Sequence, residues 1–119
     1  MATYTKQLLS GSTNGKNMQV TGTSTGASIT VHTAVAGTSD LDEIWLYAGS
    51  TGAAENLLSI EFGAAGSDSN FVYLTVPVQG TGLSLLIPGL LLQNGMVIKA
   101  YAATANTINL NGFVNRITA

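Results

Sequence analysis

The chain has 119 residues, of which 45% are hydrophobic and only 8% charged, and its formal net charge is −2. This length fits one domain, and the scarcity of charge excludes a disordered chain, a coiled coil or a helical bundle. The four basic residues are dispersed, so no nucleic-acid partner is expected. Because the chain has no cysteine, disulfides and thiolate metal sites are excluded. No signal peptide or transmembrane segment is expected, and no membrane partner.

Short alternating segments separated by Gly, Asn and Ser predict an all-β chain, with a single antiparallel β-sandwich domain over residues 1–119. This spacing gives eight or nine strands, which is typical of a sandwich. In chain order we expect strands at residues 4–9, 18–21, 28–34, 43–48, 57–62, 71–78, 83–87, 96–102 and 112–118.

Two Asn-Gly pairs predict tight turns, because both residue types tolerate a positive φ. Asn14-Gly15 predicts that residues 18–21 return as the partner of the first strand. Asn94-Gly95 is the strongest hairpin signal, between residues 90–92 and the strand that begins at residue 96. Residues 1–6 are expected either as an arm that adds a strand to a neighbour's sheet or as a frayed terminus.

Three segments, 44–47, 85–87 and 90–92, are apolar on both faces of their predicted strands. Since an antiparallel sandwich normally exposes one polar face of each sheet, these segments need a second cover. That cover is either another subunit, which the low charge favours, or thick loops over central strands. Candidate interface residues are Trp45, Tyr47, Leu86, Leu91 and Tyr101.

A G-x-S-x-G pattern around Ser24 is formally that of a nucleophile elbow. The elbow needs a following helix and a later Asp and His, whereas the only histidine, His32, precedes every candidate acid and lies in an alternating segment. Alternation places Ile29, Val31 and Thr33 on one face and His32 on the polar face, as a surface or interface residue. We therefore expect no enzyme and no catalytic residue, and a hydrolase built on Ser24 and His32 is the weakest hypothesis.

The acidic cluster Asp40-Leu41-Asp42-Glu43 is a candidate Ca²⁺ site or carboxylate pair. It lacks the calcium-loop pattern, and acidic residues before a strand commonly form turns. Asp68 begins a second calcium-like segment, but Tyr73 and Gln79 occupy its required Gly and Glu positions. No metal and no cofactor are expected.

Several segments together resemble a family of small virion proteins of tailed bacteriophages, and the resemblance runs nearly end to end. The segments are LSGSTNG at 9–15, HTAVAGT at 32–38, DEIWLYA at 42–48, IPGL at 87–90, KAYA at 99–102 and GFVNRI at 112–117.

The resemblance implies a jelly-roll-like β-sandwich and a non-enzymatic structural role. It further implies a capsid decoration (cement) protein on the phage head surface, made in the host cytoplasm, whose partners are the major capsid protein and itself, as a homo-oligomer and most readily a trimer. It carries no catalytic residues and no cofactor. The alternative is a tail- or fibre-associated sandwich that recognises host glycans through Trp45, Tyr47 or Tyr101.

Overall fold

The computed structural model describes residues 2–64 and 67–119 and consists almost entirely of strands. The strands are β1 (Thr3–Leu8), β2 (Met18–Gln19), β3 (Ile29–Thr33), β4 (Leu41–Ser50), β5 (Asn56–Gly63), β6 (Phe71–Val76), β7 (Ser84–Leu92), β8 (Val97–Ala102) and β9 (Ile108–Thr118). Two single 3₁₀ turns, η1 (Thr25–Ala27) and η2 (Asp68–Asn70), are the only helical segments in the described ranges. None of these ranges holds a helix long and apolar enough to cross a membrane.

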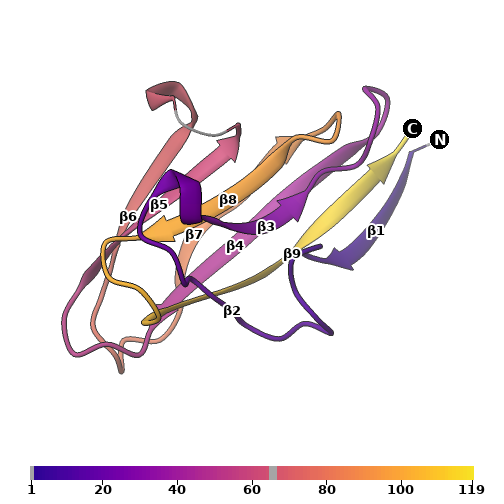
Figure 1. Cartoon of the computed structure of the whole chain (residues 1–119). Coiled ribbons are helices and arrows are strands. Elements are labelled where there is room, and N and C mark those ends of the chain that lie inside the picture. Colours follow the sequence, from indigo (N-terminus) through magenta and orange to yellow (C-terminus); the bar gives the residue numbers. More distant parts are fainter. Residues whose placement is uncertain (1, 65–66) are drawn as a thin grey trace.

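Two antiparallel sheets form the sandwich, which confirms the predicted fold class (Figure 1). Sheet A has the order β1-β9-β4-β7, with β2 also paired to β9, and sheet B has the order β3-β8-β5-β6. The pairing is nested: β5 pairs with β6, β4 with β7, β3 with β8, and the first strands with the last. This rolled-up pairing is the topology of a jelly roll.

The core lies between the sheets and follows from strand alternation. Every second side chain of β4 is buried, namely Asp42, Ile44, Leu46 and Ala48. Trp45 and Tyr47 point to the outer face of sheet A, as expected when Ile44 and Leu46 point inward. The largest fully buried aliphatic side chains are Leu9, Ile44, Leu46, Leu58, Ile60, Ile87, Ile98, Ile108 and Leu110. Each contributes about 1.5–3 kcal/mol by leaving water.

Both Asn-Gly turns have the predicted conformation but not the predicted strand pairing. Asn14, Gly15, Asn94 and Gly95 all have positive φ angles, between 55° and 83°. However, β7 pairs with β4 in sheet A while β8 belongs to sheet B, so the turn at Asn94 joins the two sheets. The hairpin prediction is wrong because an Asn-Gly pair reverses the chain without selecting its partner strand.

The first two strands also do not pair with each other, because both pair with β9. Leu8 lies opposite Phe113, and Met18 continues opposite Leu110, so β1 and β2 are two parts of one interrupted strand. Of the segment expected as an arm or frayed end, Met1 lies outside the described residues, and Thr3 onward forms the edge of the chain's own sheet.

Three register shifts change the alternation within strands, one in β3 and two between β4 and β7. In β3 the register slips between Thr30 and His32, which leaves both Val31 and His32 buried. Along β7 the register against β4 slips at Leu86 and again at Gly89, whose φ is +88°. The strand nevertheless runs from Ser84 to Leu92 through Pro88, so most of the segment predicted at 83–87 and the apolar segment 90–92 lie in one strand. Pro88 is tolerated because β7 is an edge strand, where a missing N–H breaks no ladder.

Candidate functional site

The three carboxylates of the acidic cluster point in three directions and do not converge. Asp42 points inward and is fully buried. Glu43 points to the outer face of sheet A, and Asp40 accepts a hydrogen bond from the Ala119 backbone N–H at 2.9 Å. Within the described residues, no three His, Cys, Asp or Glu side chains gather as a metal site. The cluster therefore offers neither a carboxylate pair nor a cation cage.

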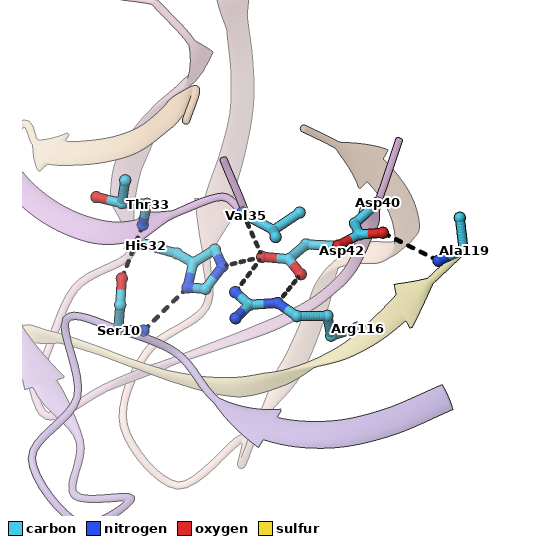
Figure 2. A network of polar contacts seen from close by, with 8 residues as sticks. All are labelled: Ser10, His32, Thr33, Val35, Asp40, Asp42, Arg116 and Ala119. Carbon is cyan, nitrogen blue, oxygen red and sulfur yellow. Dashed lines mark hydrogen bonds and ion pairs between the residues drawn. The ribbon is translucent and has the colours of Figure 1, made fainter. Parts of the chain in front are cut away.

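Asp42 is the centre of a buried polar network that connects both sheets (Figure 2). Arg116 on β9 donates two hydrogen bonds to its carboxylate, from Nε at 2.7 Å and from Nη2 at 2.9 Å. Its Oδ2 also accepts the Val35 backbone N–H at 3.0 Å and lies 2.8 Å from Nε2 of His32 on β3. A carboxylate can be buried only with such compensation.

His32 is 1% exposed, which corrects the prediction of a surface or interface histidine. The Ser10 backbone N–H donates to its Nδ1 at 2.9 Å, so this nitrogen is an acceptor. The ring proton therefore lies on Nε2 and is donated to Asp42. With the Nδ1 lone pair accepting from Ser10 and the Nε2 proton donated to Asp42, the imidazole has no free lone pair for general-base catalysis.

The serine beside the histidine is Ser10, which the sequence did not single out. Its hydroxyl accepts the Thr33 backbone N–H at 2.7 Å and so braces β3 against the loop after β1. Ser24, the candidate nucleophile, precedes η1, where its carbonyl accepts the Ala27 N–H. No helix long enough for an elbow follows Ser24 in the described chain.

The network sets the charge states of its members. Burial alone would raise the pKa of Asp42, but the hydrogen bonds from Arg116 and His32 and the guanidinium charge outweigh burial and hold this pKa below its ordinary value. The same hydrogen bond to Asp42 raises the pKa of Arg116. Both groups are therefore ionised at neutral pH.

The outer face of sheet A carries an aromatic platform, formed by Trp45 on β4 and Phe113 on β9. These two residues are directly opposite each other, and their rings lie 6.0 Å apart between centroids at an interplanar angle of 11°. Glu43 Oε1 accepts a hydrogen bond from Trp45 Nε1 at 2.6 Å and another from Asn115 Nδ2 at 2.9 Å. The Lys6 ammonium lies 4.7 Å from the centroid of the Phe113 ring.

Exposed leucines cluster on and just before β7, the edge strand beside the platform. We call this group the β7 leucine ridge; it consists of Leu83, Leu85, Leu90 and Leu91, which are 46–68% exposed. Leu90 is opposite the inward-facing Ile44, yet it is exposed because β7 ends the sheet. Met96, next to Leu91 in a surface depression shared with Leu41, adds further exposed apolar area.

The five candidate interface residues do not form one surface. Trp45, Tyr47 and Leu91 share the outer face of sheet A, whereas Leu86 packs against the core. Tyr101 lies on β8 in sheet B, edge-on to Phe71 with 6.2 Å between ring centroids. Sequence alternation separates the faces of one strand, but it does not say which strands share a sheet.

The comparisons with known proteins add no family. No protein-family model, no curated protein and no solved structure matches the chain.

Proposed function

We propose that the chain is a non-enzymatic structural protein of a tailed-phage particle. In this proposal it is a decoration (cement) protein that binds the major capsid protein on the outer head surface as a homo-oligomer, a trimer. The observation that carries the proposal is the β7 leucine ridge, an apolar edge of the sandwich that has no charge of its own.

The ridge has the chemistry of a buried contact. No charged residue occurs between Asp68 and Lys99, a stretch that includes all of β7. Interface cores are depleted of charged residues, whereas solvent-facing edge strands usually carry charged side chains that prevent unwanted pairing with other chains. Burying each leucine contributes about 1.5–3 kcal/mol, and a specific contact needs about 800 Å² per partner.

Pro88 restricts the kind of contact that a partner can make with the edge strand β7. Because proline has no N–H, it interrupts any continuous ladder that a neighbouring strand could form along β7. The contact is therefore made by leucine side chains packing on the partner, and not by addition of a strand. A three-fold arrangement would bring three such ridges against one another or against the shell.

Two further observations support the structural role. Jelly rolls are common in viral capsid domains as well as in lectins, although this is an analogy of fold. His32, which beside Asp42 most resembles a catalytic group, has both ring nitrogens engaged in structural hydrogen bonds, Nδ1 with Ser10 and Nε2 with Asp42.

The copy number per purified particle tests the location. Quantitative mass spectrometry against the major shell subunit should give hundreds of copies in a fixed ratio. A handful of copies would place the protein at the tail or a single vertex, and absence from particles would refute the proposal.

The oligomer is tested by charge on the ridge. Leu91→Asp should convert the oligomer to monomers in size-exclusion chromatography with light scattering, because it places a carboxylate within an apolar contact. Leu57→Asp is the matched control, since Leu57 is comparably exposed, at 44%, but lies on sheet B. An intact Leu91→Asp oligomer, or equal dissociation in both variants, would contradict the assignment of the ridge.

A further inference from the structure

The two edge strands of sheet B differ in how far their backbone is covered. At β3 the loop after β1 lies along the edge: the Gly11 N–H donates to the Val31 carbonyl oxygen at 2.9 Å, and the Thr33 N–H donates to Ser10 Oγ at 2.7 Å. In the described part of the chain, β6 has β5 on one side and no strand on the other (Figure 1). The outward backbone groups of β6 are therefore available to a further strand.

The sequence of β6 also lacks the features that normally protect an edge strand. Proteins protect such strands with charged side chains, proline or bulges. In sheet A, β1 carries the exposed Lys6 and β7 contains Pro88, and in sheet B the β3 strand has a bulge. The sequence of β6 is FVYLTV, without charge, proline or glycine, and its register against β5 is continuous. Among the strands at the ends of the two sheets, β6 is the one best suited to pair with another strand.

The side chains of β6 that point into the sandwich are incompletely covered. Val72 and Leu74 pack against the core and are only partly buried. Ile60 and Leu58, which lie opposite them on β5, are fully buried. A strand added beyond β6 would remove this remaining apolar area from water if its own inward side chains were aliphatic.

The outer face of β6 sets a second requirement for an added strand. Tyr73 is 55% exposed and stacks on Phe71 with 5.3 Å between ring centroids, and Thr75 is also exposed. Aromatic and β-branched side chains form favourable cross-strand pairs with one another. The matching strand is therefore uncharged, aliphatic on one face and aromatic or β-branched on the other. The sequence of β6 itself has this pattern.

We propose that β6 pairs with the β6 strand of a second copy, antiparallel and across a two-fold axis, so that two four-stranded sheets become one continuous sheet. A two-fold axis perpendicular to the sheet keeps the inner faces of both copies on the same side, as the aliphatic pattern requires. Opposite residues of antiparallel strands point to the same face, so one residue of β6 lies on the axis. Tyr73 or Leu74 at this place gives the longest overlap of the two strands.

This contact is weak between free molecules. A stable interface buries about 800 Å² per partner, and the edge of one six-residue strand offers less than that. We therefore expect a dissociation constant of about 0.1–1 mM. Copies that bind side by side on a surface reach millimolar effective concentrations, at which the contact forms. It belongs to sheet B, whereas the β7 leucine ridge belongs to sheet A, so the proposal is independent of the capsid role.

Sedimentation equilibrium of Leu91→Asp isolates this contact from the ridge. The variant should be monomeric at about 10 µM and should reach a monomer–dimer equilibrium between about 0.1 and 1 mM. No increase in mass up to about 1 mM would overturn the proposal. The ridge is judged from the mass at low concentration and the β6 contact from the increase with concentration, so the two failures are distinguishable.

Like charges on β6 test the pairing within the same Leu91→Asp background. Tyr73→Lys combined with Thr75→Lys places lysines opposite each other in both registers and should raise the dissociation constant at least tenfold. The control, Thr30→Lys with Thr33→Lys, adds the same charge to exposed positions of β3 and should change it by less than about twofold. Dimerisation that survives the β6 lysines, or equal weakening by both double substitutions, would refute the contact. Circular dichroism would verify that both variants are folded.

A single introduced thiol locates the axis, because the chain has no cysteine of its own. Either Tyr73→Cys or Leu74→Cys should form disulfide-linked dimers under mild oxidation at about 1 mM, since a residue on the axis faces its own copy. Thr33→Cys, exposed on the covered β3 edge, is the control and should cross-link at least severalfold more slowly. Equal rates for all three variants would indicate random collision and would contradict the two-fold pairing.

Discussion

The two faces of β4 place adjacent carboxylates in opposite environments. Asp42 points into the sandwich and is bound by groups from β3, β9 and the segment after β3. Glu43 points outward and holds the indole of Trp45 and the amide of Asn115. The carboxylate of Asp42 therefore links the two sheets by hydrogen bonds, whereas that of Glu43 orients side chains on the outer face of sheet A.

Asp42 and Glu43 are both carboxylates, yet substituting one should affect a different property of the protein from substituting the other. A buried charge without its partners is costly, so the inner network should act on folding. The outer group lies on the solvent-facing side of the sheet and costs less to neutralise, so its loss should change the surface around Trp45 and leave folding largely intact.

The largest expected effect is that of Asp42→Asn. The substitution leaves the Arg116 guanidinium without its carboxylate and should lower the free energy of unfolding by about 3 kcal/mol or more. Urea denaturation monitored by Trp45 fluorescence would measure it. A loss below about 1 kcal/mol would show that the network contributes little to stability.

A smaller decrease in the free energy of unfolding should follow when the pH is lowered. Because the folded-state pKa of Asp42 is lowered, its contribution is complete above the unfolded pKa of about 3.9 and is lost as the pH falls below that value, through the folded pKa. Stability should therefore decrease in this range in the wild type and less steeply in Asp42→Asn. Equal pH slopes for the two proteins, measured by urea midpoints, would contradict this.

The smallest effect on stability is expected for Glu43→Gln. The carboxamide oxygen can still accept from Trp45 Nε1, so the free energy of unfolding should change by no more than about 0.5 kcal/mol. The indole N–H resonance should nevertheless shift, because a charged acceptor becomes neutral. A destabilisation comparable with that of Asp42→Asn would remove the distinction between the two faces.

Local sequence patterns predicted the fold well and the polar network poorly. Most strands begin and end within a few residues of the predicted segments, because alternation and turn residues are local properties. The burial of Asp42 was predictable from the sequence, because strand alternation places it on the same inward face of β4 as Ile44 and Leu46. Its partner Arg116 lies 74 residues away, and only the pairing of β4 with β9 brings the two together.

Long-range pairing also explains the other errors. His32 is buried because a bulge in β3 shifts the alternation. The sequence of residues 28–34 contains no pattern that predicts this bulge. The Asn-Gly turns fixed backbone angles but not strand partners. The platform needed Trp45 and Phe113, 68 positions apart, to become cross-strand neighbours, so sequence alternation alone could only place Trp45 outward.

The nested strand pairing has a consequence for how the chain folds. The β5–β6 hairpin closes the shortest loop, and each pair formed then shortens the loop that the next must close, from β4–β7 to β3–β8 and finally β1–β9. We therefore expect folding to proceed from the middle of the sequence outward, slowly for a chain of this size. Substitutions in β5 and β6 should slow folding, whereas those in β1 should mainly accelerate unfolding.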